Sequence, residues 1–324
     1  MELSNAEESL TVVVVSYNSK NVIIDALTPF VDEPGISLLV VDNASQDSTV
    51  DDIRHHLPSA EILQLTENLG FAKAVNLAIE SSSSSNILLL NPDAVIAADD
   101  VRALLSALTP DTGIVAPLIK EPGDRLQIVS AGHFPTIWRM FLHFSAISRS
   151  SKAYTNLQGH YLFPQNLKSQ PMAVDWVTGA CMLFKKATWR RAGGLSEQWF
   201  MYAEDIDYCF RVKSLGLPVV LVPTVSASHL VGKSDSTGSY NANPAWILNL
   251  HEFYELELSP SKFHGWLWCW VVGAGLLSRS LLFHTKALRS GRLSPWTAEG
   301  HRFRAFAFAV MRRGTLPRRN PHQD

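Results

Sequence analysis

The first 120 residues alternate between short, continuously apolar runs and longer amphipathic segments. The apolar runs predict strands at Thr11–Ser16, Ser37–Asp42, Ala60–Leu65 and Asn86–Asn91. Because these runs are apolar at every position, we expect both faces of each strand to be covered. The segments 21–30, 47–57 and 71–82 are long enough to be crossover helices. The pattern predicts an α/β domain with a mostly parallel sheet flanked by helices.

Polar residues gather where each predicted strand ends. They are Ser16-Tyr17-Asn18, Asp42-Asn43, Asn68-Leu69-Gly70 and Asn91-Pro92-Asp93. In open α/β sheets, ligands bind outside the carboxyl ends of the strands, where helix N-termini offer unpaired N–H groups. Each cluster alone is also typical of ordinary turns and helix caps. Four such clusters at one edge predict a ligand site.

The periodicity fades between Gly123 and Pro171, where the aromatic-rich stretch HFPTIWRMFLHF stands out. A long irregular segment of this kind favours a lid or an acceptor site, or else a loop packed around its own small core. Regular patterning returns at MAVDWVTGACMLFKK, residues 172–186, which predicts a pair of strands.

The most apolar segment of the chain is Gly265–Phe283. Its length approaches the ~20 residues that cross a bilayer, but Arg279 lies near one end, which favours a re-entrant or interfacial helix over a full span. Trp266, Trp268 and Trp270 suit the headgroup boundary of a membrane. A buried core helix or a dimerisation helix is the alternative, and the oligomeric state stays open.

Composition and charge add an appendage to this picture. With 324 residues, of which 46% are apolar and 18% charged, the chain is long and apolar enough for a sizeable core, which excludes a disordered protein. We expect a catalytic domain at 1–235 and a helical, membrane-associating region at 236–324. Residues 286–324 carry nine Lys or Arg against two acids, although the whole chain has a net charge of −2. This basic tail favours an anionic membrane over nucleic acid, because no stacking aromatics of a nucleic-acid module accompany it.

The cysteines and the N-terminus indicate the compartment. Cys181, Cys209 and Cys269 are odd in number and widely spaced, so they predict neither a disulfide framework nor a metal site. The N-terminal MELSNAEESL is acidic and lacks the pattern of a secretory signal. We expect a cytoplasmic protein that is peripheral on the inner face of the cell membrane.

Several stretches, taken in order, resemble the family 2 glycosyltransferases, and more closely their rhamnosyltransferase branch. They are VVVVSYNSKNVI, LLVVDNASQDST, NLGFAKAVNLAI, LLLNPDAVI, DWVTGACMLFKK, GGLSEQWFMYAEDIDYCFRVKSLG and VPTVSASHLVG. The resemblance runs from Thr11 to about Gly232. It implies a GT-A type nucleotide-sugar-binding domain with a mostly parallel, mixed central sheet flanked by helices, followed by a C-terminal helical appendage.

The resemblance implies a donor site for a nucleoside-diphosphate sugar, with dTDP-rhamnose first and UDP-sugars next. The residues assigned to it are Ser16, Tyr17, Asn18, Asp42, Asn68, Gly70, Asn76 and Asn91. Asp42 can accept hydrogen bonds from a pyrimidine imide or a ribose hydroxyl. Gly70 would let the backbone approach the ligand closely. Asn76 would hydrogen-bond the sugar nucleotide or merely cap a polar stripe.

The resemblance also implies a divalent metal ion, Mg²⁺ or Mn²⁺. Asn91-Pro92-Asp93 stands where many relatives carry an aspartate-any-aspartate motif, but here only Asp93 is a carboxylate. One carboxylate can suffice, because such ions bind one or two protein oxygens together with substrate phosphates. His229 lies where some relatives place a second metal contact. The departure from the motif leaves metal dependence open.

Three carboxylates, Glu204, Asp205 and Asp207, fall within four residues. On a helix, Glu204 and Asp205 would occupy the first turn, where the helix dipole favours their ionised forms, and this structural role alone would explain them. Asp207 and Arg211 are four residues apart and would pair. The resemblance implies that Asp205 is the catalytic base and that Glu204 supports it or binds the acceptor.

The combined expectation is an inverting, non-processive glycosyltransferase of surface polysaccharide synthesis with a lipid-linked glycan acceptor. The Gln-x-x-Arg-Trp motif of processive synthases is missing, since the chain has no Arg-Trp pair. Trp176 and Gly179 are expected on the acceptor side. The first alternative is a catalytically inactive nucleotide-sugar-binding or membrane-scaffolding protein. The last is a nucleotidyltransferase, which would need a glycine-rich phosphate loop early in the chain, and the stretch SYNSKNV is not such a loop.

Overall fold

The computed structural model describes residues 9–121, 126, 128–145, 147–150, 155–229, 243–290 and 295–313. The chain divides into two compact units, one of Met1–His133 with Tyr161–Gly238 and one of Phe134–His160 with Ser239–Asp324. The second unit thus takes in 134–160 as well as the C-terminal region, and the division expected near residue 235 stays a prediction. The acidic N-terminus up to residue 8, the end of the basic tail and the end of the last matching stretch lie outside the described residues.

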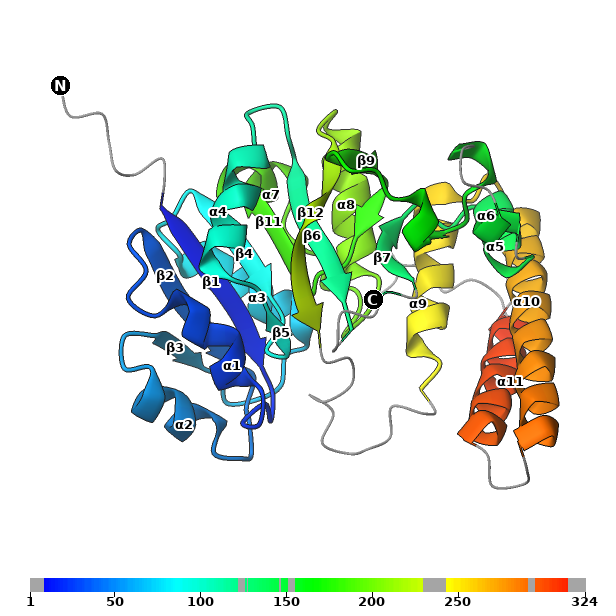
Figure 1. The fold of residues 1–324 in the computed structure, drawn as a ribbon, viewed down its shortest axis with the longest axis horizontal. Helices are drawn as coiled ribbons and strands as arrows, with labels where there is room; N and C mark the ends of the chain where they lie inside the picture. The colour runs from blue at the N-terminus through cyan, green and yellow to red at the C-terminus, as the bar shows by residue number, and fades with distance from the viewer. Residues whose placement is uncertain are drawn as a thin grey trace. The chain divides into compact units, whose positions relative to one another are not determined.

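The first unit is built on a mixed sheet whose strands run in the order β3-β2-β1-β4-β11-β6-β12-β5, with β9 paired to β12 (Figure 1). The strands are β1 (Leu10–Ser16), β2 (Ile36–Asp42), β3 (Glu61–Gln64), β4 (Asn86–Leu90), β5 (Ala94–Val95), β6 (Ile114–Lys120), β9 (Met172–Val174), β11 (Cys181–Lys185) and β12 (Val219–His229). The four predicted strands form one parallel set, β3-β2-β1-β4, and β6 and β12 also pair in parallel. Strand β11 is antiparallel to both of its neighbours, β4 and β6, which makes the sheet mixed.

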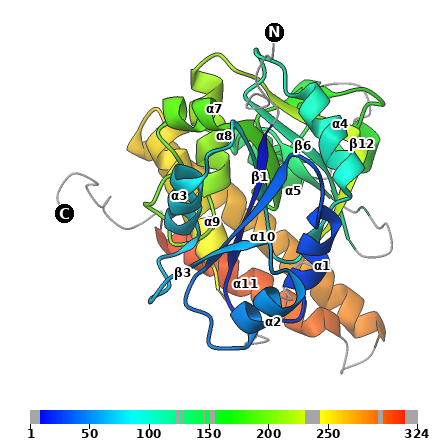
Figure 2. The same ribbon diagram turned by 90° about the vertical axis from the view of Figure 1, so that its left-hand side faces the viewer.

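Helices cover both faces of this sheet, as the apolar runs predict. They are α1 (Ile23–Leu27) with a 3₁₀ turn (Thr28–Phe30), α2 (Thr49–His56), α3 (Phe71–Ser81), α4 (Ala98–Ala107), α7 (Lys186–Ala192) and α8 (Glu204–Ser214). Figure 2 shows α1 and α4 on one side of β1 and α3 and α8 on the other. The three predicted crossover helices are therefore confirmed as α1, α2 and α3.

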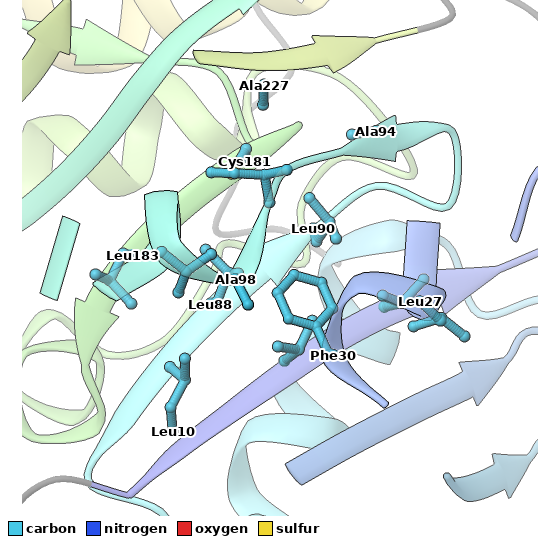
Figure 3. Packing of buried hydrophobic residues seen from close by; sticks show 14 of the residues in the cluster. Leu10, Leu27, Phe30, Leu88, Leu90, Ala94, Ala98, Cys181, Leu183 and Ala227 are labelled. Carbon is cyan, nitrogen blue, oxygen red and sulfur yellow. The ribbon is translucent and has the colours of Figure 1, made fainter. Parts of the chain in front are cut away.

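The main core lies between the sheet and helices α1 and α4 (Figure 3). Val12 and Val14 of β1 face this core, where they pack with Phe30 and its neighbours. Val13, which points to the other face, is equally buried. Because both faces are covered, every position of the strand is apolar, and this is the pattern that made the strand recognisable in the sequence.

The predicted strand pair at 172–186 is wrong, because this stretch divides between two sheets. β9 and β11 belong to the large sheet, whereas β10 (Trp176–Val177) pairs with β7 (Val129–Gly132), which pairs in turn with β8 (Tyr161–Leu162). Asp175 lies between β9 and β10, where the chain passes from the large sheet to the small one. Its carboxylate lies 3.1 Å from His133 Nδ1 and 2.6 Å from Lys213 Nζ. These contacts involve residues remote in sequence, so local patterning does not reveal them.

The second unit is helical. It contains α5 (Ile137–Phe144), α6 (Ile147–Ser150), α9 (Ala245–Phe253) followed by a π-helical turn (Tyr254–Leu258), α10 (Lys262–Ser290) and α11 (Pro295–Arg313). The aromatic-rich stretch forms α5, which packs against α10: Trp268 Nε1 donates to Pro135 O at 2.6 Å, and Phe144 fills the space beside Gly275. The stretch is therefore a helix packed against a segment remote in sequence rather than a loop with its own small core, and a role as a lid or an acceptor site stays a prediction.

Helix α10 is longer than the segment predicted for it, and it is the one helix in the described part of the chain that is long and apolar enough to cross a membrane. Trp266 and Trp270 are each 42% exposed, but Trp268 is fully buried and stacks on Tyr254. The expectation that all three tryptophans meet a headgroup boundary is therefore wrong for Trp268. Residues two apart on a helix point in different directions, so one face cannot carry all three.

Candidate functional site

The carboxyl ends of β1 and β2 form one polar corner. Ser16 and Asp42 are partners across the two strands. Asp42 Oδ2 accepts the N–H of Ser45 at 3.1 Å, and Ser45 Oγ accepts the N–H of Asn18 at 2.9 Å. Asp42 Oδ1 and Ser16 Oγ are buried and have no hydrogen-bond partner among the described residues, while Tyr17 beside them is half-exposed. Buried polar atoms gain most from a partner, so a ligand that donates to Asp42 would fit here.

The loop before α3 is fixed by Asn43, which belongs to one of the predicted strand-end clusters but was given no role in the donor site. Asn43 Oδ1 accepts the N–H of Leu69 at 2.8 Å, and its Nδ2 donates to Gly70 O at 3.2 Å. Asn68 Oδ1 closes the same turn by accepting the N–H of Gly70 at 3.0 Å. Gly70 has a φ of +83°, and a Cβ there would lie 2.8 Å from Phe200 O. Glycine is therefore required by the backbone conformation and by packing against Phe200, and the close approach of a ligand that we expected here stays a prediction.

Asp93 and His229 form a pair of potential metal ligands. Strand β5 follows the Asn91-Pro92-Asp93 turn and pairs with the end of β12, which brings His229 Nε2 to 2.9 Å from Asp93 Oδ1 and 3.4 Å from Asn91 Nδ2. Adjacent ligands of an octahedral ion bound at ~2.1 Å stand about 3 Å apart, so the two donor atoms fit neighbouring positions around Mn²⁺ or Mg²⁺. No group of three or more acidic, His or Cys ligands occurs among the described residues. The residues fit an ion that takes its other ligands from phosphate and water.

Helix α8 begins with Glu204 and Asp205. Asp205 Oδ2 accepts the N–H of Gly179 at 3.1 Å, and its Oδ1 accepts the N–H of Ile206 at 2.8 Å. Burial raises the pKa of Asp205, and these hydrogen bonds partly oppose the rise. Burial, together with the neighbouring charge of Asp205, raises the pKa of Glu204 to about 8. Burial thus outweighs the helix terminus, and Glu204 is mainly protonated at neutral pH, contrary to the ionised form that we expected.

We expect Glu204→Gln to remove a pH-dependent loss of stability. In the folded protein the pKa of Glu204 is about 8, against an ordinary value of 4.5, so the protonated form contributes stability that is lost as pH rises through about 8. Glutamine stays neutral, so between pH 5 and 8 the free energy of unfolding of the wild type should fall relative to the variant by ~2–5 kcal/mol. Denaturation curves of both proteins across this range would measure it. Parallel profiles would contradict the assignment.

These parts are joined through the β4–β11 ladder. The N–H of Asn91, next to Asp93, donates to Ala180 O at 2.9 Å, and the neighbouring Gly179 is bound to Asp205. Because β1 and β4 pair in parallel, the turn that contains Asn91 lies at the same edge of the sheet as Ser16. The structure therefore brings the polar corner, the Asp93–His229 pair and Asp205 to one end of the sheet.

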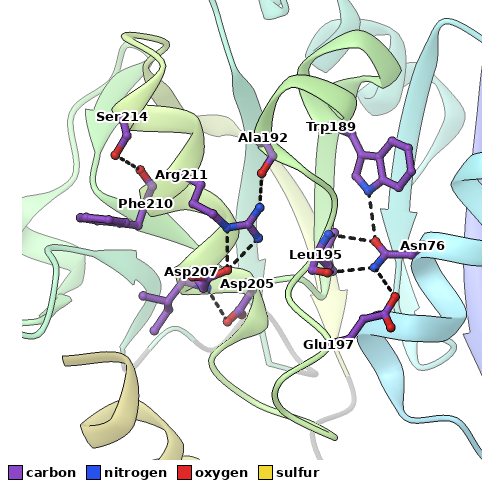
Figure 4. A network of polar contacts seen from close by, with 11 residues as sticks. Asn76, Trp189, Ala192, Leu195, Glu197, Asp205, Asp207, Phe210, Arg211 and Ser214 are labelled. Atoms are coloured by element: carbon purple, nitrogen blue, oxygen red, sulfur yellow. Dashed lines mark hydrogen bonds and ion pairs between the residues drawn. The ribbon is translucent and has the colours of Figure 1, made fainter. Parts of the chain in front are cut away.

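Asn76 does not face a ligand in this arrangement. Its Nδ2 donates to Leu195 O at 2.8 Å and to Glu197 Oε1 at 3.0 Å, and its Oδ1 accepts from Trp189 Nε1 at 3.2 Å and from Leu195 N at 2.8 Å (Figure 4). Two donors and two acceptor positions are the full capacity of an amide. Asn76 instead holds the loop between α7 and α8.

The two residues expected on the acceptor side differ in their surroundings. Trp176 is 3% exposed, and its Nε1 donates to His133 O at 3.1 Å, so its ring serves the small sheet rather than a ligand. Gly179 lies against Asp205: a Cβ added at Gly179 would lie 3.5 Å from the Cβ of Asp205. Gly179 therefore positions the carboxylate through its N–H.

The predicted pair of Asp207 and Arg211 is confirmed. Asp207 Oδ2 accepts from Arg211 Nε at 2.9 Å and from Nη2 at 2.7 Å, and Arg211 Nη1 donates to Ala192 O (Figure 4). The guanidinium therefore ties α8 to the end of α7. The sequence spacing revealed the ion pair, but it gave no signal for the contact with Ala192.

The sequence matches known glycosyltransferases. The family described as glycosyl transferase family 2 matches residues 11–184. N-acetylglucosaminyl-diphospho-decaprenol L-rhamnosyltransferase of Mycobacterium tuberculosis is 28% identical over 281 residues, which cover 80% of this chain and 87% of that protein. Rhamnosyltransferase WbbL of Escherichia coli is 26% identical over 145 residues, which cover 44% of this chain and 51% of that protein.

Solved structures share the fold. The mannosyltransferase PcManGT from Pyrobaculum calidifontis, in complex with GDP-Man and Mn²⁺, matches with a TM-score of 0.54 at 18% identity. The match covers 94% of this chain and 86% of that protein's chain. GalNAc-T7, with UDP, GalNAc and Mn²⁺, matches with a TM-score of 0.56 at 11% identity. This match covers 98% of this chain and 60% of that protein's chain. The predicted GT-A fold class is confirmed. The family match spans more than half of the chain, including the polar corner and the Asn91–Asp93 turn, and the chain therefore belongs to glycosyl transferase family 2.

Proposed function

We propose that this glycosyltransferase moves one sugar at a time, rhamnose being the leading candidate, from a nucleoside diphosphate to a hydroxyl of a lipid-linked glycan in surface polysaccharide synthesis. One observation carries the proposal: the Asp93–His229 pair and the half-buried Asp205 are linked through Asn91 and Gly179 at one end of the sheet. The name of the mycobacterial relative supports both the sugar and the lipid-diphosphate acceptor.

In the proposed reaction, Asp205 takes the proton of the acceptor hydroxyl while that oxygen bonds to the anomeric carbon. The bond from this carbon to the diphosphate oxygen breaks with its electron pair going to the diphosphate, so attack from the opposite side inverts the configuration. The N–H of Gly179 holds Asp205 in place. A divalent ion held by Asp93 and His229 would supply positive charge to the departing diphosphate.

A membrane-bound acceptor is supported by the helical unit. Large apolar side chains are exposed along α10, namely Phe263, Trp266, Trp270, Leu281, Leu282 and Leu288. Among the described residues of α10 and α11, eight Lys or Arg stand against Glu299 alone. Apolar side chains with surrounding positive charge suit the surface of an anionic bilayer. We propose that this unit holds the enzyme on the inner face of the cell membrane.

The test is a transfer assay with purified protein and a short-chain lipid diphosphate carrying N-acetylglucosamine. The donors are dTDP-rhamnose, UDP-sugars and GDP-mannose, each after chelation and after addition of Mn²⁺ or Mg²⁺. We expect transfer from one donor, stimulated by metal, and a product anomer opposite to that of the donor. Binding of nucleoside diphosphates without consumption of any sugar would instead favour the inactive binding protein, and a retained anomer would contradict inversion.

A further inference from the structure

Three consecutive large apolar side chains stand exposed in the loop just before α8. Phe200 is 59% exposed, Met201 44% and Tyr202 40%. Contiguous exposed apolar residues of this kind mark binding surfaces more often than isolated ones do. Helix α8 starts two residues after Tyr202 and carries Asp205 in its first turn.

This loop is held at both of its ends and in its middle. Phe200 O accepts the N–H of Phe71 at 3.0 Å, which fixes the loop to the start of α3. Asn76 holds Leu195 and Glu197, and Arg211 holds the last residue of α7 (Figure 4). Rings displayed on a rigid scaffold bind at lower entropic cost than rings on a mobile loop, so the exposed side chains suit recognition.

The backbone of the loop is strained at Tyr202. Its φ is +71°, and that of the next residue, Ala203, is +75°. The left-handed region disfavours a bulky side chain, whereas Gly or Asn would adopt it readily. Strain of this type persists where the surrounding contacts impose it, and it clusters at ligand sites.

We infer that Phe200 and Tyr202 form a platform on which a sugar ring of the acceptor stacks. The inference rests on the proposed function, in which Asp205 takes the acceptor's proton, so the exposed surface nearest to Asp205 along the chain is the one that the acceptor meets. The nucleotide has its own place at the Ser16–Asp42 corner. The apolar face of a pyranose, lined by C–H groups, is complementary to the negative face of an aromatic ring. An acceptor carbohydrate is therefore the ligand that fits.

The experiment compares Tyr202→Asn, Tyr202→Phe and Phe200→Ala with Leu77→Ala, a control that removes an exposed apolar side chain from α3 in the same unit. Transfer to a soluble short-chain acceptor and to a long-chain acceptor is measured with the acceptor varied at saturating donor and with the donor varied at saturating acceptor. The unfolding midpoint of each variant is measured as well. We expect Tyr202→Asn and Phe200→Ala to raise the acceptor KM roughly three- to tenfold with the donor KM unchanged. Tyr202→Phe and Leu77→Ala should match the wild type. Because Asn tolerates the left-handed region, Tyr202→Asn should unfold at or above the wild-type midpoint.

Each other outcome overturns the inference. An unchanged acceptor KM in both Tyr202→Asn and Phe200→Ala would remove the platform. A higher donor KM would place the nucleoside base on these rings, and an effect confined to long-chain acceptors would place the lipid there. A wild-type protein that transfers no sugar from any donor would defeat the proposed function itself, and that result is separate from these three.

Discussion

Asp205→Asn is expected to lower the turnover of the enzyme by ~10²–10⁴-fold, the usual contribution of a general base. Asparagine keeps the size of the side chain, and its oxygen can still accept the N–H of Gly179, although its NH₂ group cannot accept the N–H of Ile206 as Asp205 Oδ1 does. What the variant loses is the ability to take the acceptor's proton. Initial rates at saturating donor and acceptor would measure the loss.

Two controls make this result specific. Asp99→Asn changes a carboxylate of α4 whose side chain is 96% exposed, and it should leave turnover unchanged. The unfolding midpoint of Asp205→Asn should stay close to that of the wild type, because burial raises the pKa of Asp205 and a neutral side chain avoids the cost of a buried charge, which offsets the lost hydrogen bond from Ile206. A folded Asp205→Asn protein that retains more than a tenth of the wild-type turnover would contradict the role of Asp205.

The parts of the fold that could be predicted are those whose sequence pattern records burial. β1 and β4 are apolar at successive positions because α1 and α4 cover one face and α3 and α8 the other. The helices between the strands could be predicted from local sequence, because a crossover between parallel strands needs a segment of a minimum length. The strand-end clusters were predictable for a related reason: parallel strands bring their carboxyl ends to the same edge.

The parts that could not be predicted depend on partners far away in the chain. The family resemblance assigned Asn76 to the donor, yet residues 189–197 use its whole amide. Trp176 was assigned to the acceptor, but its ring is buried by a small sheet that local patterning does not reveal. Nothing in the sequence marks Phe200 and Tyr202 as surface residues, because an aromatic run is more often core than surface and only exposure separates the two cases.

Asp93 and His229 are the candidate ligands of a divalent metal ion. We expect Asp93→Asn to weaken Mn²⁺ binding at least tenfold in the presence of a nucleoside diphosphate, and to lower kcat/KM for the donor by ~10²-fold or more. Asp93 is the one carboxylate at this turn, and a neutral amide oxygen is a poorer ligand for a hard divalent ion. Titration of free Mn²⁺ by electron paramagnetic resonance reports binding independently of turnover.

Asn91→Asp is the matched opposite change. Asn91 Nδ2 already lies 3.4 Å from His229 Nε2, so a carboxylate at the same place would face His229 and add a second negative charge to the turn. We therefore expect Asn91→Asp to strengthen Mn²⁺ binding, whereas Asp93→Asn weakens it. If neither substitution changes Mn²⁺ binding, the pair is not the metal site, and the 2.9 Å contact between His229 and Asp93 serves only to hold β5 against the end of β12. Opposite shifts from two residues of one turn would be hard to explain by general loss of structure, because misfolding lowers affinity in both variants.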